Sequence, residues 1–216
     1  MGPAFRGRGQ ISLEFLLIFG VLMIMLVYSV RVATFAKDSP SVDVLRVQVA
    51  LEEKSLADVI SGTINQVYAQ GPGSKATGYA KLFYLRNPDY LEKAWGVKEP
   101  RVLVTYGSLG VENGTCVAVV NGTGNTTLIP RGGDKNVLCS PSLYSRNLLE
   151  NGTVWNGTGV IVTVNGTSRN IYGLVIAPSN ISPVVKITVE WNPDEGEAWE
   201  FNETAGEIRI NINPGG

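Results

Sequence analysis

The side chains that could do chemistry in this chain are few, and they form no catalytic pattern. The sequence of 216 residues contains no histidine, which removes the commonest general base and the commonest metal ligand. Carboxylates are present, but no activated nucleophile is visible beside them. An acidic turn at residues 194–197 could bind Ca²⁺, but its spacing matches no specific loop, so we interpret it as a solvated turn. We expect no enzymatic activity, no metal and no cofactor.

The two cysteines, Cys116 and Cys139, allow two interpretations. In a protein outside the cytoplasm they predict one disulfide, which in the loop-entropy model would stabilise the folded chain by about 3 kcal/mol. Alternatively, they are two buried thiols that pack as small hydrophobic side chains. We expect the disulfide, and neither interpretation makes these residues catalytic.

The composition describes a folded protein of ordinary charge. Hydrophobic residues make up 44% of the chain and charged residues 17%, which suits one domain with a substantial extension. The net charge is −1, and the 18 Lys and Arg form no dense basic stripe. We therefore expect no nucleic-acid partner.

One charged residue, Glu14, lies at the start of a long apolar segment. Residues 15–30 carry no charge, and with the residues just before Glu14 the segment reaches about 20 residues, enough for a membrane-spanning helix. A charge in such a segment costs roughly 2.5 to 3.5 kcal/mol unless it finds a partner. Arg6 and Arg8 precede it, which predicts a cytoplasmic N-terminus and places the chain after Arg31 outside.

A secretory signal peptide would also combine basic residues with an apolar run. Here the expected small-residue cleavage site after the run is missing, and residues 31–40, RVATFAKDSP, continue the helical pattern. We therefore expect the apolar segment to be retained as an anchor. A plain anchor, however, needs no glutamate at this position and no glycine before the glutamine.

Residues 8–15, RGQISLEF, resemble the class III signal peptide of archaeal type IV pilins, whose motif reads Q-x-S-x-E-F. The resemblance implies that a membrane prepilin peptidase cuts between Gly9 and Gln10. Residues 1–9 would be removed as the signal peptide, and Glu14 would become the fifth residue of the mature chain. The resemblance covers about the first 30 residues, and the rest of the chain must be interpreted by itself.

The resemblance also implies assembly contacts through Gln10, Glu14 and Phe15. Cleavage would create an α-amino group on Gln10 that is largely cationic at neutral pH. Glu14 could pair with this amine within its own helix, or with the amine of an adjacent subunit when helices stack with an axial stagger. If Gln10 cyclises to a neutral pyroglutamate, Glu14 would need another donor, such as Ser12 of a neighbour.

A second helical pattern begins near Pro40. Proline at the first helical position, with Ser39 as a possible N-cap, predicts that the helix kinks or restarts there. Apolar residues then recur at helical spacing to about Gln70, at Val42, Leu45, Val49, Leu56, Val59, Ile60 and Val67. Glu52, Glu53, Lys54 and Asp58 fall largely outside this stripe. Residues 10–70 are thus expected to form a bent helix of roughly 90 Å, apolar in its first half and amphipathic in its second.

Residues 71–100 are expected to be a connecting segment, and residues 101–216 a β-rich head. Nine short runs rich in β-branched residues lie between Asn-Gly, Gly or Pro turn signals, at 101–106, 115–120, 125–129, 136–139, 159–164, 170–177, 184–191, 198–201 and 207–212. They predict antiparallel strands in a β-sandwich or barrel-like head, and an α+β fold overall. Trp155, Trp191 and Trp199 are expected to pack within it.

The head is also rich in N-glycosylation acceptor triplets. Eight occur, beginning at Asn113, Asn121, Asn125, Asn151, Asn156, Asn165, Asn180 and Asn202. Composition alone would give about two under the acceptor rule. Five of the eight read Asn-Gly-Thr, so hairpin-turn chemistry is a competing cause, but it does not explain the threonine. We predict a glycosylated outer surface.

These observations together favour a structural subunit of an archaeal type IV pilus, exported to the cell surface for adhesion. The implied partners are identical subunits in a helical filament, the prepilin peptidase, the pilus assembly ATPase with its membrane platform, and the membrane before assembly. One alternative is an archaellum filament subunit, which the glutamate pattern around Glu14 disfavours. The other is a monomeric membrane-anchored protein that binds carbohydrate or another cell, for which cleavage after Gly9 would have no use.

Overall fold

The structure is a computed structural model that describes residues 13–35, 40–107, 109, 114–129, 135–144, 158–192, 194 and 199–212. It is an α+β protein with an apolar N-terminal helix and a mostly β C-terminal part. The chain divides into two compact units, Met1–Val44 and Leu45–Gly216.

Two long helices occupy the first part of the chain. Helix α1 spans Leu13–Phe35, where Leu, Ile, Met and Val dominate and no proline interrupts. Helix α2 spans Pro40–Gln70, so a helix begins at Pro40 as predicted, while Ser39 lies outside the described residues. It ends at the predicted position because Gly71 takes a positive φ of 85° and its N–H donates to the Val67 carbonyl at 3.0 Å.

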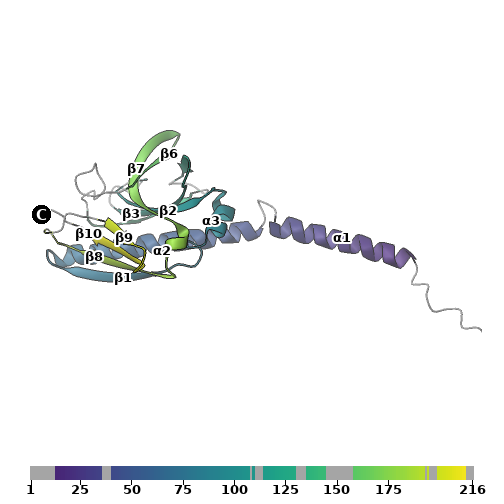
Figure 1. Ribbon diagram of the computed structural model, residues 1–216, viewed down its shortest axis with the longest axis horizontal. Coiled ribbons are helices and arrows are strands. Elements are labelled where there is room, and N and C mark those ends of the chain that lie inside the picture. The colour runs from purple at the N-terminus through teal and green to yellow at the C-terminus, as the bar shows by residue number, and fades with distance from the viewer. Residues whose placement is uncertain are drawn as a thin grey trace, which may run out of the picture. The chain divides into compact units, whose positions relative to one another are not determined.

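The C-terminal unit contains two β-sheets (Figure 1). A four-stranded sheet has the order β1-β8-β10-β9, and a six-stranded sheet has the order β4-β6-β7-β2-β3-β5. Their strands are β1 (Lys75–Lys81), β2 (Pro100–Tyr106), β3 (Gly114–Asn121), β4 (Thr126–Leu128), β5 (Val137–Pro141), β6 (Thr158–Val164), β7 (Thr167–Ile176), β8 (Val184–Glu190), β9 (Trp199–Asn202) and β10 (Glu207–Asn211). Each of the nine predicted runs is therefore a strand.

The strand pairing departs from the prediction in two places. Strand β10 pairs parallel to β8, and β4 pairs parallel to β6, whereas the prediction was wholly antiparallel. In the four-stranded sheet, β9 and β10 form an antiparallel hairpin, and β10 inserts between β9 and β8. Strand β10 therefore lies next to both strands, antiparallel to β9 and parallel to β8. Local patterns place strands but do not order them in a sheet.

The predicted connecting segment contains a strand and a helix. Strand β1 pairs with β8 from Lys75 to Lys81, and helix α3 (Pro88–Trp95) follows it. The Asn87 side chain caps α3 by accepting from two backbone N–H groups, and the helix ends at Gly96, which has φ 67°. Residues 71–100 therefore contain a paired strand and a capped helix, whose structure the sequence alone did not predict.

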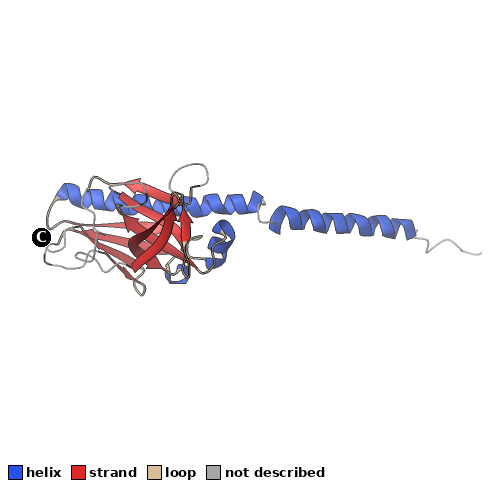
Figure 2. Ribbon diagram, turned by 90° about the horizontal axis from the view of Figure 1, so that it is seen from above, coloured by secondary structure: helices blue, strands red, loops and turns tan. Residues whose placement is uncertain are grey.

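The first hydrophobic core lies between α2, α3 and the inner faces of both sheets. Figure 2 shows α2 running alongside the strands. Its predicted apolar stripe supplies the buried residues Val49, Leu56, Ile60 and Val67. Gly78 of β1 permits close approach, because a Cβ there would lie 2.7 Å from the Thr63 hydroxyl oxygen on α2. Trp199 is buried as expected, Trp191 packs against this core, and Trp155 lies outside the described residues.

A second core lies on the other side of the six-stranded sheet. Leu103, Cys116, Ala118 and Val120 face Leu128 and the apolar residues of β6 and β7. Figure 1 shows β6 and β7 curling away from β2 and β3, which encloses this second core. Strands β2 and β3 are consequently buried on both faces, which explains why they read as continuous rather than alternating apolar runs.

Candidate functional site

Helix α1 presents an exposed apolar surface over Leu13–Val32. Its segment Leu13–Val32 is long and apolar enough to cross a membrane, by length and composition, and none of it is buried. The large side chains from Phe15 to Val30 each leave about half or more of their area exposed. An uncharged surface of this size requires lipid or protein to cover it.

Glu14 lies in the first turn of α1 and is exposed. A carboxylate there interacts favourably with the helix dipole, which is a local reason for its position besides pairing. Phe15 is 60% exposed, and its ring lies 6.3 Å from that of Phe19. Gly9 and Gln10 lie outside the described residues, so the cleavage site and the amine partner of Glu14 remain predictions.

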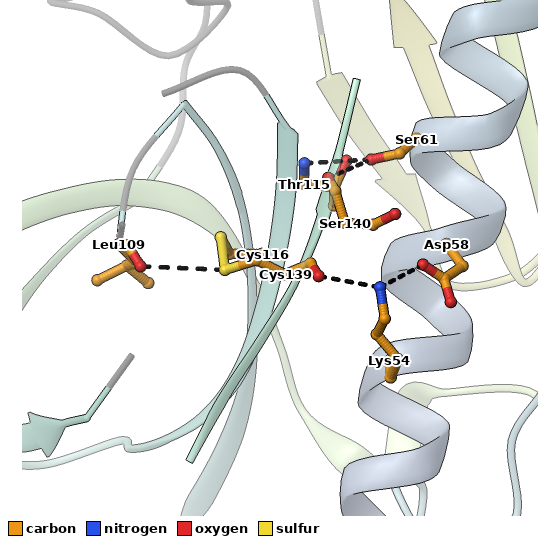
Figure 3. Close-up of a disulfide and its surroundings, with 8 residues drawn as sticks. All are labelled: Lys54, Asp58, Ser61, Leu109, Thr115, Cys116, Cys139 and Ser140. Atoms are coloured by element: carbon orange, nitrogen blue, oxygen red, sulfur yellow. Dashed lines mark hydrogen bonds and ion pairs between the residues drawn. A yellow bond between two sulfur atoms is a disulfide. The ribbon is translucent and has the colours of Figure 1, made fainter. Parts of the chain in front are cut away.

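The predicted disulfide is confirmed. Cys116 on β3 and Cys139 on β5 are directly opposite each other in the antiparallel ladder, with sulfur atoms 2.05 Å apart (Figure 3). Strand β5 is an edge strand of the six-stranded sheet. The disulfide therefore attaches this edge covalently to the sheet, in addition to its backbone hydrogen bonds.

Helix α2 contacts the same edge strand through polar side chains (Figure 3). Lys54 donates to the carbonyl of Cys139 at 3.0 Å and to the Asp58 carboxylate at 2.6 Å. Ser61 donates to the carbonyl of Ser140 at 2.8 Å and accepts from the Thr115 N–H at 3.2 Å. These side chains satisfy backbone groups of β3 and β5 that adjoin the helix and hold α2 in register with the sheet.

A carboxylate on α2 also holds the chain between β1 and α3. The two oxygens of Glu52 accept hydrogen bonds from the backbone N–H groups of Phe83, Tyr84 and Leu85, at 2.7 to 2.9 Å. Charge-assisted bonds of this kind are roughly twice as strong as neutral ones. Glu52 therefore positions a short aromatic segment whose conformation the sequence alone did not predict.

The expectation that Glu53 lies outside the buried stripe was wrong. Glu53 is fully buried, and among the described residues neither of its carboxylate oxygens has a hydrogen-bond partner. Burial raises the pKa of Glu53 well above its ordinary value, and the nearby Trp95 indole N–H offsets only part of this shift. The signal was visible, because Glu53 is four residues after Val49 and three before Leu56, both in the stripe.

A second carboxylate, Glu207 on β10, is buried but fully paired. It accepts from the Thr188 hydroxyl at 2.6 Å and lies 2.9 Å from the Lys186 ammonium and 3.3 Å from Arg209. The Thr188 hydroxyl, then Lys186 and Arg209, lower the pKa of Glu207 to about 2, while burial acts in the opposite direction. This cluster connects β8 with β10, the pair that runs parallel.

Five of the eight acceptor asparagines are described. Asn125 and Asn165 are exposed, and Asn121, Asn180 and Asn202 are partly exposed. Asn113, Asn151 and Asn156 lie outside the described residues. Four of the five lie in turns or loops or at the ends of strands, and Asn180 is the last residue of a short 3-10 helix (Pro178–Asn180).

The five sites differ in whether the side-chain nitrogen is engaged. Asn165 and Gly166 have φ values of 51° and 78° and form the tight turn between β6 and β7, so the turn preference of Asn-Gly accounts for part of this triplet. By contrast, the Asn180 amide nitrogen donates to Glu203 at 2.7 Å, beside a polar surface hollow of about 390 Å³. The acceptor nitrogen of Asn125 likewise donates to Thr163 at 2.8 Å.

No candidate metal centre is found among the described residues. Within the described part of the chain, no three His, Cys, Asp or Glu side chains lie close enough to hold a metal ion. Of the acidic turn, only Asp194 is described. The comparisons with known proteins found no matching family model, no matching curated protein and no matching solved structure.

Proposed function

We propose that this chain is a structural subunit of an archaeal type IV pilus that serves in surface adhesion. The single observation that carries the proposal is the exposed apolar helix α1 beginning directly within the Q-x-S-x-E-F motif. A membrane anchor alone would account for the apolar helix. It would not account for the combined spacing of glycine, glutamine, serine, glutamate and phenylalanine over residues 9–15.

Filament assembly would keep the apolar side chains of helix α1 covered at every stage. Before assembly, lipid covers its apolar side chains, and a filament would replace lipid with the helices of identical subunits. The apolar surface then never meets water. Glu14 is the one carboxylate in this segment, and the α-amino group of Gln10 on a neighbouring subunit supplies the opposite charge in a water-poor core.

The head has properties that suit the outside of such a filament. Two curled sheets, arranged as a sandwich-like head, would form the outer layer, with the disulfide between Cys116 and Cys139 stabilising an edge strand. Disulfides persist in oxidising surroundings outside the cytoplasm. Glycans on the acceptor triplets would hydrate the surface of the head and cover strand edges.

Substitution of Glu14 tests the proposal in cells from which the unaltered gene has been deleted. Glu14→Val removes the charge, so membrane insertion becomes easier while pairing with the amine is lost. We expect normal expression and membrane retention with few filaments, counted by electron microscopy. Glu14→Asp keeps the charge, and Ile18→Val changes only the volume of an apolar side chain in the same helix. Both controls should retain more filaments than Glu14→Val.

Two results would contradict the proposal. The unaltered chain could fail to appear in any surface filament, which would favour the monomeric anchored protein. Alternatively, Glu14→Val could assemble at normal yield, and the charge-pairing account of Glu14 would then be wrong.

A further inference from the structure

Every Asn-Gly pair in this chain is followed by threonine. The pairs begin at Asn113, Asn121, Asn151, Asn156 and Asn165, so no Asn-Gly pair lies outside an acceptor triplet. Ser and Thr account for 28 of the 216 residues, and chance would place one of them after all five pairs with a probability on the order of 10⁻⁴ or less. The converse does not hold, because three of the eight triplets contain no glycine. The pattern therefore indicates that Asn-Gly requires the threonine, not that the acceptor triplet requires glycine.

Asn-Gly pairs are prone to a backbone reaction that converts asparagine into aspartate. The backbone nitrogen of the glycine loses its proton and attacks the asparagine Cγ, the Cγ–Nδ2 bond breaks, and ammonia leaves. Water then adds to either carbonyl group of the cyclic imide and breaks its bond to the nitrogen. The products are aspartate and isoaspartate, and isoaspartate adds one methylene to the main chain. Glycine favours the attack because it has no Cβ to obstruct it.

The structure leaves this reaction unobstructed at Asn165 and Gly166. The two residues form the exposed tip between β6 and β7, and a Cβ on Gly166 would have no atom of a non-neighbouring residue within 4 Å. Within the described part of the chain, neither the Asn165 side chain nor the Gly166 N–H makes a hydrogen bond. Ring closure needs rotation about the Cα–C bond of Asn165, and at an exposed tip this rotation displaces no packed side chain.

Asn121 and Gly122 show the opposite arrangement. The Gly122 N–H donates to the Glu99 carbonyl at 3.0 Å, so the attacking nitrogen is engaged. The Asn121 side-chain oxygen accepts from the N–H and from the hydroxyl of Thr123, each at 3.1 Å. Because both groups must leave these partners before the ring can close, Asn121 should react about tenfold more slowly than Asn165.

Conversion of Asn165 would damage the part of the fold that encloses the second core. The tip joins β6 and β7 with Val164 opposite Thr167. Val162 and Val164 of β6 and Ile171 of β7 all belong to the second core. An isoaspartate would lengthen the main chain of a two-residue turn whose geometry sets this register.

We propose that a glycan on Asn165 protects the Asn165–Gly166 peptide from this reaction, and that such protection is the reason for the threonine after each Asn-Gly pair. This inference rests on the glycosylated head of the proposed function. A sugar on Nδ2 turns the leaving ammonia into a larger, substituted amine and obstructs the path of the Gly166 nitrogen to Cγ. The turn then keeps the Asn-Gly pair that its positive φ values of 51° and 78° favour, without the chemical fragility of that pair.

Two substitutions at the exposed Thr167 separate the effect of the glycan from that of the turn. Thr167→Ala removes the acceptor triplet, whereas Thr167→Ser keeps it, and neither changes Asn165 or Gly166. Full chains are extracted with detergent from the membranes of the cells that normally produce them. They are then incubated at mildly alkaline pH, where the attacking nitrogen loses its proton more readily.

Mass spectrometry of proteolytic peptides measures the conversion of residue 165 to aspartate and isoaspartate. Peptides are analysed with their glycans attached, because enzymatic release from asparagine would itself produce aspartate. We expect residue 165 to convert severalfold faster in Thr167→Ala than in Thr167→Ser, whose glycopeptide should stay intact.

Unglycosylated chains provide the matched control for the turn itself. When they are made in cells that add no N-glycans, the unaltered chain and Thr167→Ala should convert at the same rate at Asn165. In the same samples Asn121 should convert about tenfold more slowly, because of its hydrogen bonds and those of Gly122.

The outcomes separate this inference from the proposed function. If Thr167→Ser carries a glycan on Asn165 and still converts as fast as Thr167→Ala, the inference is wrong. It is also wrong if Asn165 of the unglycosylated chain converts no faster than Asn121. If the unaltered chain carries no glycan on Asn165, the inference fails, whereas filament assembly is tested independently by the Glu14 substitutions.

Discussion

Removing the charge of Glu207 should destabilise the head in a strongly pH-dependent way. The side chain is 7% exposed and contacts the Thr188 hydroxyl, Lys186 and Arg209. Glu207→Gln keeps the shape and an acceptor oxygen for Thr188 but loses both ion pairs. The variant therefore resembles the protonated carboxyl at every pH.

The magnitude follows from the pKa of Glu207. A carboxyl whose pKa falls from 4.5 to about 2 on folding contributes about 3 kcal/mol to the free energy of unfolding at neutral pH. Because the folded-state pKa is the lower one, this contribution is complete above the unfolded pKa. It is lost as the pH falls from about 4.5 towards 2.

Urea titrations of the full chain in detergent, followed by tryptophan fluorescence, would measure the effect between pH 2 and pH 7. We expect Glu207→Gln to lower the free energy of unfolding by about 3 kcal/mol at pH 7 and by much less near pH 2. Glu190→Gln is the matched control, because it also removes one negative charge. Its partner Lys75 is 61% exposed, so that ion pair should be worth less than about 1 kcal/mol.

If Glu207→Gln lowers the free energy of unfolding at pH 7 by no more than Glu190→Gln does, the predicted contribution of Glu207 is wrong. It would equally be refuted by a difference between Glu207→Gln and the unaltered chain that stays constant down to pH 2.

Three further predictions concern the other described features. Glu53→Leu should raise the free energy of unfolding at pH 7 by about 1 to 3 kcal/mol. Because burial raises the pKa of Glu53, this gain should disappear as the pH falls below 4.5, and a less stable variant at pH 7 in the same titrations would contradict it. Replacing both cysteines by serine should cost about 3 kcal/mol, seen as a lower unfolding temperature, and alkylation of the native unreduced chain would contradict the disulfide. Glycopeptide mass spectrometry should find Asn165 more fully occupied than Asn180, whose nitrogen is engaged by Glu203; equal occupancy would count against that ranking.

The strands from β2 onward and the two long helices were predictable because each depends on a local pattern, whereas strand β1 (Lys75–Lys81) was not predicted. The runs of β-branched residues between turn signals located every predicted strand, and Pro40 and Gly71 mark where α2 begins and ends. Helix α3 could also have been predicted, since Asn87 and Gly96 are ordinary capping residues. Its eight residues fall within a mixed aromatic and charged segment, where a short apolar stripe is hard to recognise.

Other features depend on contacts between distant parts of the chain. The insertion of β10 between β8 and β9 has no local signature, and neither has the contact of Glu52 with residues 83–85. The disulfide was predictable because the chain has only two cysteines. Glu53 was misplaced because Glu52 and Lys54 on either side suggested a solvated face, although the helical spacing placed it in the stripe.

The central claim is that this chain is cleaved after Gly9 and assembled into a filament. Mass spectrometry of the protein in purified surface filaments tests both parts in one measurement. The proposal predicts that the filaments contain this polypeptide and that its N-terminal peptide begins at Gln10, with a free or cyclised glutamine. Filaments that lack this polypeptide, or N-terminal peptides that begin at Met1 or Gly2, would contradict it.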